Sequence, residues 1–255
     1  MQLMLTRQNI DYKRIRIVRI LVTFNNNNTN YGTGFFIGSH GLILTCAHVI
    51  LGKDFKFVKK DKEFIDAQGA GNQEKAANYH LLLTNNIKVK LEDGTFRQVN
   101  LEKINPDYDI ALLRVTEVNF DHPYFKVNKA MEPYLGEDIS FYGFPSVLGH
   151  TPDNSPFVVN RSIISTFPEV EIAGGKYLHM QINATTIGGI SGAPIFKGNE
   201  NTVVGIINGN YHWALNNIVC RSDNGDRVLS TKVPLGIGYA TSMKVINENT
   251  DIFSN

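Results

Sequence analysis

Apolar and polar residues alternate in short runs along most of this chain. Short alternating runs bounded by Gly, Pro, Asn or Asp are typical of β-strands. The runs in the first half are RIRIVRILVTF, GTGFFIG, GLILTCAHVI and the expected hairpin NIKVKLEDGTFRQVNL. The second half continues with EDISFYGFP, FVVNRSIISTF, KYLHMQINA, GAPIF, TVVGIINGN and GIGYATS. The pattern predicts an all-β fold with little helix, built as a sandwich or a pair of barrels.

Two segments interrupt this rhythm. The run NNNNTN, residues 25–30, is polar and turn-favouring, so we expect a loop at a hairpin tip. Residues 53–85 are first charged and then rich in Gly, Gln and Ala, and they are too long for an ordinary connection. They are either an ordered insertion with a short helix or a functional loop.

Composition and charge narrow the classes of function. The chain has 255 residues, 42% of them hydrophobic, which is enough for one large domain or two small ones. Its net charge of +1, with no basic stripe, argues against nucleic acid as a partner. The first residues carry scattered charges and no cleavage site, so we expect a cytoplasmic protein with no membrane partner.

The two cysteines, Cys46 and Cys220, are far apart and form no spacing typical of metal ligands. We therefore expect buried, reduced thiols, and neither a metal nor another cofactor.

The stretch TTIGGISGAPIF, residues 185–196, places Ser191 among glycines. A serine hydroxyl needs a base and a group that orients the base before it can act as a nucleophile. Candidates are His48, at the end of an apolar run, and Asp109, which heads the run IALLRV. Each residue alone has a plainer explanation: a turn serine, a structural histidine, an acid that caps a turn. Together, the order His48, Asp109, Ser191 on an all-β chain is that of two-barrel serine peptidases.

Five blocks carry a resemblance to trypsin-like serine peptidases, and they occur in the family's order: GTGFFIGSHGLILTCAHVI, NPDYDIALLRV, GGISGAPIF, TVVGIINGN and GIGYATS. The chain is most similar to the bacterial HtrA/Deg and glutamyl-endopeptidase branches. The resemblance runs from about residue 15 to residue 247, and no PDZ-like block follows it within this sequence.

The resemblance implies a chymotrypsin-like fold of two six-stranded antiparallel β-barrels with the active site in the cleft between them. Residues 1–255 would form a single peptidase domain. The first barrel would span about residues 15–125, including the insertion at 53–85, and the second residues 126–247.

The resemblance also assigns roles to the candidate residues. Ser191 would attack the peptide carbonyl, His48 would move the proton to the leaving amine, and Asp109 would orient the imidazole. The N–H groups of Gly189 and Ser191 would bind the oxyanion, and a side chain at Gly189 would obstruct the turn. A protein or peptide substrate is the expected partner.

One position departs from the family. Ile190 stands where digestive trypsins have an Asp that pairs with a new N-terminal amine, and where HtrA members commonly have Asn. The oxyanion loop is therefore either ordered by packing, or loose until a substrate or regulatory protein binds, which would make the enzyme latent. Residues 53–85 would then be an exosite, a lid or a docking surface. The rival interpretation is an inactive peptidase fold that binds peptides as a scaffold.

The resemblance also predicts where the specificity pocket lies. The resemblance points to Thr185 or Thr186 and to Asn208–Asn210, none of which carries a charge. An uncharged pocket argues against cleavage after Lys or Arg. It favours small or medium apolar residues, with Glu as an alternative, although His212 could take the place of the glutamyl-binding histidine only through a loop shift.

Overall fold

A computed structural model describes residues 7–24, 29–52, 87–146, 151, 154–172, 175–220 and 227–254. For residues 212–220 and 227–234 it describes the backbone alone. The expected insertion at residues 53–85 lies outside the described residues, so the predictions made for it stay untested.

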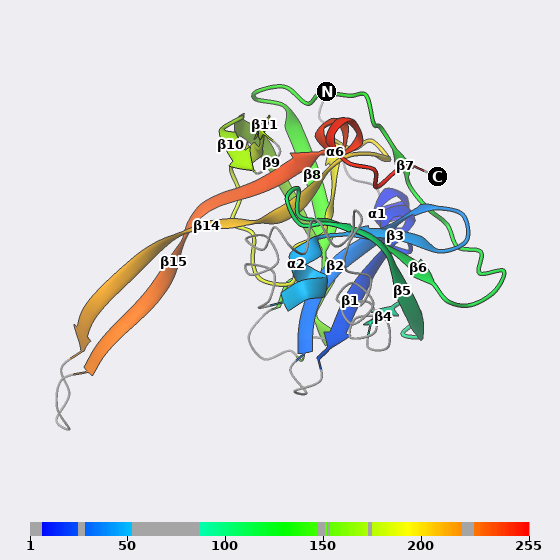
Figure 1. Cartoon of the computed structure of the whole chain (residues 1–255), viewed down its shortest axis with the longest axis horizontal. Helices are drawn as coiled ribbons and strands as arrows, with labels where there is room; N and C mark the ends of the chain where they lie inside the picture. Colours follow the sequence, from blue (N-terminus) through cyan, green and yellow to red (C-terminus); the bar gives the residue numbers. More distant parts are fainter. Residues whose placement is uncertain are drawn as a thin grey trace, which may run out of the picture.

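The first barrel is closed and antiparallel, with strands in the order β1-β2-β3-β6-β5-β4 (Figure 1). Its strands are β1 (Ile17–Thr23), β2 (Thr29–Gly38), β3 (Leu42–Thr45), β4 (Ile87–Lys90), β5 (Phe96–Asn105) and β6 (Ile110–Val115). Pairing of Thr45 with Ala111 places the end of β3 beside the start of β6. One loop boundary was wrong: Thr29 and Asn30 belong to β2, because they pair with Thr23 and Val22 of β1.

The second barrel has the strand order β13-β8-β9-β12-β15-β14, and the pairing of β13 with β14 closes it. Its strands are β8 (Asp138–Gly143), β9 (Val158–Thr166), β12 (Met180–Ile182), β13 (Pro194–Lys197), β14 (Thr202–Cys220) and β15 (Arg227–Ser242). Strand β7 (Lys126–Val127) adds to β14 in parallel, and β10 (Glu169–Ile172) pairs with β11 (Gly175–Leu178) as a separate hairpin. The predicted fold of two six-stranded barrels is therefore confirmed.

Alternating side chains of these strands fill the barrels, as the sequence pattern requires. In the second barrel, the buried cluster contains Ile139, Phe141, Ile182, Ile195 and Val204. The larger cluster contains the core of the first barrel, Phe120 and Phe125 of the segment that follows β6, and Tyr142 and Phe196 of the second barrel.

Helices are short: α1 (Arg7–Arg14), α2 (Ala47–Leu51) and α6 (Met243–Asn249). Helix α1 inserts the buried side chain of Lys13 between rings of the second barrel, with Nζ 4.2 Å from the ring centroid of Phe196. Helix α6 begins at Ser242, whose hydroxyl accepts the N–H of Val245 at 3.1 Å. Within the part of the chain that the structure describes, no helix is long and apolar enough to cross a membrane.

Candidate active site

The ends of β3 and β6 bring His48 and Asp109 together. Helix α2 begins two residues after Thr45, and Asp109 immediately precedes β6, so both residues leave the first barrel at the same edge. His48 Nδ1 lies 2.8 Å from Asp109 Oδ2, and the backbone N–H of His48 donates to Oδ1 at 2.9 Å. Asp109 adopts a φ of 53°, a left-handed conformation that Asp tolerates better than most residues. The carboxylate therefore fixes both the ring and the turn that carries it.

Further bonds hold this pair in place. The amide of Asn30 donates to the carbonyls of His48 at 3.1 Å and Val49 at 2.7 Å, which anchors the turn of α2. On the other side, Asn208 Nδ2 donates to Asp109 Oδ2 at 3.2 Å. The hydroxyl of Thr241 donates to Asn208 Oδ1 at 2.9 Å, so the amide has a fixed orientation. Asp109 thus accepts bonds from both barrels.

The pair also sets the charge of the site. Burial opposes protonation of His48, but the charge of Asp109 and its hydrogen bond outweigh burial, so the pKa of His48 is raised from its usual 6.5. Burial and the same carboxylate raise the pKa of Tyr239 to about 12, so this phenol stays neutral. An imidazolium formed during a reaction would be stabilised here.

Ser191 sits in a tight loop of the second barrel that includes Gly189 and Gly192. Gly192 has a φ of 88°, and a Cβ on it would lie 1.9 Å from the carbonyl oxygen of Thr33. Gly189 has a φ of 89°, and a Cβ there would lie 2.7 Å from the carbonyl oxygen of Phe144. Both positions therefore need glycine, for space as well as for conformation.

Thr33, a buried residue of β2, ties this loop to the first barrel. Its N–H donates to the carbonyl of Ser191 at 2.8 Å, and its hydroxyl donates to the carbonyl of Gly189 at 2.8 Å. The same hydroxyl accepts the N–H of Phe144 at 3.0 Å. One side chain thus links β2, the end of β8 and the loop that carries Ser191.

The backbone of this loop leaves two N–H groups available. The carbonyl of Gly188 accepts the N–H of Ser146 at 2.5 Å. In a trans peptide the next N–H points the opposite way, so the N–H of Gly189 is directed away from Ser146. Among the described residues, neither the N–H of Gly189 nor that of Ser191 donates to a protein acceptor. Donors without a protein partner are one requirement of an oxyanion hole.

Ile190 lies between these two N–H groups, and its side chain is only 2% exposed. It belongs to the apolar cluster of the second barrel, and a Cβ on Gly143 would lie 2.8 Å from its Cδ1. Ile190 is therefore held by apolar packing and not by the ion pair that an Asp at this position makes in digestive trypsins.

The hydroxyl of Ser191 donates to the backbone carbonyl of Asn208 at 3.1 Å. It must leave this carbonyl before its proton can pass to an imidazole. Ser191 therefore lies next to the first residues of the predicted pocket.

The predicted pocket residues lie around this point. Thr186 is buried, and its hydroxyl donates to the carbonyl of Gly209 at 2.7 Å. Thr185 is exposed, and its Oγ1 would lie 3.6 Å from a Cβ on Gly236 of β15. The side chain of Asn208 points to Asp109 instead of into a pocket, so only its backbone is available to a ligand.

Sequence reasoning proposed His48, Asp109, Ser191 and Gly189, of which the structure pairs His48 with Asp109 and places Ser191 and Gly189 in one loop. It missed Thr33 and Asn30, because a polar residue within a strand run gives no sign of a partner far away in the chain. It gave Asn208 a pocket role, whereas its amide supports Asp109. The available signal was that the polar residue Asn208 directly follows the apolar run VVGII.

Cys46, His48 and Asp109 have potential metal-ligand atoms within 4.8 Å of one another. Cys46 is buried and reduced, and its thiol donates to the carbonyl of Ile207 at 3.2 Å. Burial, and next the charge of Asp109, raise the pKa of this thiol well above its usual value. Since metal binding needs a thiolate, this cluster is a poor metal site. The side chain of Cys220 lies outside the described residues.

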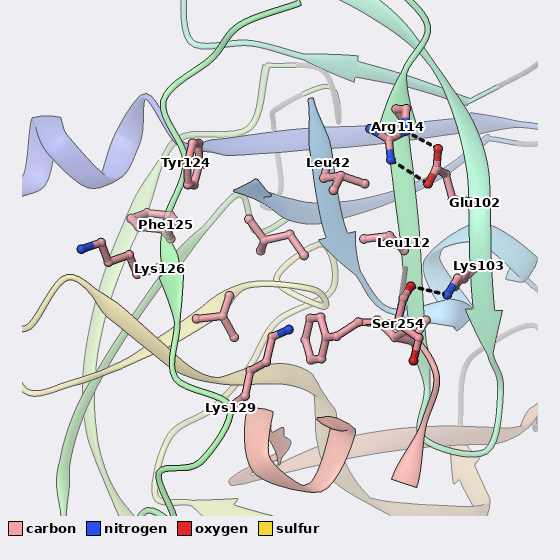
Figure 2. Close-up of a pocket in the computed structure, with 14 residues that line it drawn as sticks. Leu42, Glu102, Lys103, Leu112, Arg114, Tyr124, Phe125, Lys126, Lys129 and Ser254 are labelled. Atoms are coloured by element: carbon pink, nitrogen blue, oxygen red, sulfur yellow. Dashed lines mark hydrogen bonds and ion pairs between the residues drawn. The ribbon is translucent and has the colours of Figure 1, made fainter. Parts of the chain in front are cut away.

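A separate pocket of about 640 Å³ lies between the first barrel and the C-terminal segment (Figure 2). His48, Asp109 and Ser191 are not among the residues that line it. Its apolar wall includes Leu42, Leu112 and Phe253. Two of its cations have partners, because Arg114 pairs with Glu102, and Lys103 donates to the carbonyl of Ser254 at 2.7 Å. The described residues that line this pocket include no histidine, cysteine or aspartate.

Comparisons with known proteins show the fold and the family of this chain. A family model described as "Trypsin-like peptidase domain" matches residues 32–206, more than half of the chain. The structure is similar to the crystal structure of the Rv3671c protease from M. tuberculosis in its active form, with a TM-score of 0.60 and 18% identity. That match covers 94% of this chain and 81% of the other, and at such low identity it shows the fold alone. No curated protein matches the chain significantly.

Proposed function

Because this chain belongs to the trypsin-like peptidase domain family, we propose that it is a serine endopeptidase that cleaves proteins or peptides through an acyl-enzyme. The observation that carries the proposal is the 2.8 Å contact of His48 with Asp109, together with Asn208, which is bonded both to Asp109 and to the hydroxyl of Ser191. A mere turn between strands would need neither feature.

The reaction would begin with Ser191. Its Oγ attacks the peptide carbonyl carbon, while His48 accepts the hydroxyl proton. Asp109 stabilises the imidazolium, and the N–H groups of Gly189 and Ser191 bind the oxyanion. The tetrahedral intermediate collapses as His48 gives the proton to the leaving amine, which breaks the C–N bond. Water, deprotonated by His48, then attacks the acyl-enzyme and releases Ser191.

For specificity, we propose a preference for small or medium apolar residues at the cleaved bond. None of the predicted pocket residues carries a charge, and the hydroxyl of Thr186 is already bonded to the carbonyl of Gly209. Cleavage after Glu is the alternative. A peptide-library profile decides, because an apolar optimum supports this assignment and a Glu optimum replaces it.

Regulation is a second part of the proposal. Packing of Ile190 and the bonds of Thr33 support an oxyanion loop that is ordered before substrate binds. A latent state would therefore rest on the bond of the Ser191 hydroxyl to Asn208, or on the segment at residues 53–85. Full activity of the isolated chain on a short peptide, unchanged by deletion of residues 55–80, would rule out latency.

A fluorophosphonate probe tests the main proposal, because it reacts only with an activated serine. We expect one label per chain, lost in Ser191→Ala and kept in Ser165→Ala, a matched change at an exposed serine of β9. If the unchanged protein never reacts, the chain is an inactive peptidase fold that acts as a peptide-binding scaffold.

A further inference from the structure

The pocket of about 640 Å³ in Figure 2 is lined by apolar side chains from three parts of the chain. Leu42 of β3 and Leu112 of β6 come from the first barrel. Val127 of β7 and Phe253 of the C-terminal segment add to this apolar lining. Pockets of several hundred Å³ with mostly apolar walls are typical of small-molecule sites. This pocket is therefore large enough for the apolar body of a small molecule.

Basic side chains outnumber acidic ones in the lining, where Glu102 is the only carboxylate among the described residues. Arg114 donates to both carboxylate oxygens of Glu102. Lys103 donates to the carbonyls of Asp251 at 2.8 Å and Ser254 at 2.7 Å. These two cations are therefore already engaged in holding the wall of the pocket together.

Lys129 is the cation that an occupant of the pocket would meet. Figure 2 shows its side chain reaching toward Phe253, with Nζ 4.3 Å from the ring centroid, whereas Lys126 points outward. Lys129 has no carboxylate partner among the residues that the structure describes. Lys129 and Tyr124 are exposed, so the pocket opens to solvent on this side. An anionic group would therefore find an available ammonium group beside an apolar surface.

The barrel strands in the lining offer no edge to a peptide. Strands β3, β5 and β6 each have a paired neighbour on both sides in the closed barrel, so a polypeptide cannot add to them as a further strand. A lysine ammonium is a compact point charge, which attracts a carboxylate or a phosphate without selecting its geometry. Recognition therefore depends on an apolar body and a negative charge, and not on backbone bonds.

We propose that this pocket binds an amphipathic organic anion, an aliphatic chain that ends in a carboxylate or a phosphate monoester. The chain lies against Leu42 and Leu112, and the head group pairs with Lys129 on the exposed side. A medium-chain fatty acid is the simplest molecule of this class. The site does not depend on the proposed peptidase function, because none of the three proposed triad residues lines the pocket.

Isothermal titration calorimetry of the unaltered protein with octanoate, decanoate and dodecanoate, each below its micelle-forming concentration, tests the apolar part of the site. Each added methylene should lower Kd by about fourfold until the pocket is full, as burial of a methylene group requires. We expect one decanoate bound per chain. Absence of binding, or binding that does not strengthen with chain length, would overturn the inference.

The charge of the head group is tested with decanol and decyltrimethylammonium, which carry the same chain. Both should bind about tenfold more weakly than decanoate or worse, because a contact between charged groups is stronger than a neutral one. Decyl phosphate, compared with decanoate, identifies the preferred head group. Equal binding of the cationic homologue would show that the pocket does not select anions and would overturn the proposal.

A charge reversal locates the head group. Lys129→Glu should weaken decanoate binding by about tenfold or more and remove the advantage of decanoate over decanol. Lys88→Glu is the matched control, because Lys88 is an exposed lysine of β4 that does not line the pocket, and it should bind decanoate as the unaltered protein does. Equal losses in both variants would show attraction by net charge alone and would overturn the site.

A filled pocket locates the chain. Leu42→Trp places a larger side chain in the apolar lining and should abolish decanoate binding. Unchanged affinity in a variant that circular dichroism shows to be folded would overturn the location, and if the variant does not fold, Lys129→Glu decides.

The active-site probe separates this site from the proposed catalytic one. Saturating decanoate should leave fluorophosphonate labelling of the unaltered protein in place, whereas competition would place the anion at Ser191 and overturn the separate site. Absence of labelling without decanoate would refute the peptidase function, and the calorimetric results would still decide the anion site.

Discussion

The two halves of the site are held in different ways. In the first barrel, His48 and Asp109 are joined by a side-chain bond and a backbone bond, at the adjoining ends of two paired strands. In the second barrel, the loop of Ser191 depends on contacts with Thr33 of the other barrel and on the packing of Ile190. The proposed base is thus held mainly within the first barrel, with one added bond from Asn208, whereas the proposed nucleophile and oxyanion donors are held by contacts between the barrels.

The largest loss of turnover should come from disrupting the contact of His48 with Asp109. Asp109→Asn should keep the fold but lower turnover by roughly 10⁴-fold, because the amide favours the wrong tautomer of His48. Asp107→Asn, two residues earlier in the same turn, is the control and should remain active. Steady-state kinetics of both variants check this, and a severe loss in Asp107→Asn instead would contradict the assignment.

Disrupting the contact of Thr33 with the loop of Ser191 should lower turnover less. Thr33→Val removes the hydroxyl that holds Gly189, which misplaces one oxyanion donor, and we expect kcat to fall by roughly 10- to 100-fold with little change in KM. Thr33→Ser keeps the hydroxyl and should restore most of the activity. A KM effect with unchanged kcat would show that Thr33 does not position the oxyanion hole.

The pH dependence separates the halves. His48 must be neutral to act as a base, so activity should fall as the pH drops through its raised pKa, above the usual 6.5. The ion pair itself stabilises the fold at low pH, and this contribution disappears as the pH rises through the same raised pKa. In Asp109→Asn the acid limb of kcat/KM should move to lower pH, whereas in Thr33→Val it should stay. An unmoved limb in Asp109→Asn would contradict the coupling.

The smallest effect concerns packing beneath the loop. Ile190→Val removes one buried methylene and should lower the free energy of unfolding by about 1 kcal/mol. The rate of fluorophosphonate labelling should change little, since the shape of the site is retained. Denaturant unfolding measures the first quantity. A large loss of labelling with unchanged stability would show that Ile190 acts on the reacting atoms directly.

Much of this arrangement follows from local sequence. Strand alternation predicted an all-β fold, and the family resemblance implied the two six-stranded barrels that the structure contains. The order of His48, Asp109 and Ser191 predicted a triad, of which the structure shows the pair of His48 and Asp109. Helix α1 was missed, because its eight residues are polar and show no apolar period. The roles of Thr33 and Asn208 were missed since each depends on partners in the other barrel, which no local pattern encodes.

The long two-stranded ribbon formed by β14 and β15 was also missed. The strand prediction ended at Asn210 and resumed at Gly236, because Asn and Ser residues interrupt the pattern between them. The ladder of β14 and β15 continues through these polar positions, because backbone pairing between two strands does not require apolar side chains. Alternation along one strand reports a buried face, and it gives no sign of a strand that leaves the barrel.

Pre-steady-state hydrolysis of an activated ester by the isolated chain tests most directly that both halves act on one serine in a site that is already assembled. The account predicts a rapid burst of alcohol equal to one equivalent of protein, followed by slow turnover. The burst should be absent in Ser191→Ala and much slower in Asp109→Asn. A protein that shows no burst, or a burst that survives in Ser191→Ala, would contradict the assignment of Ser191 as the nucleophile of a preassembled site.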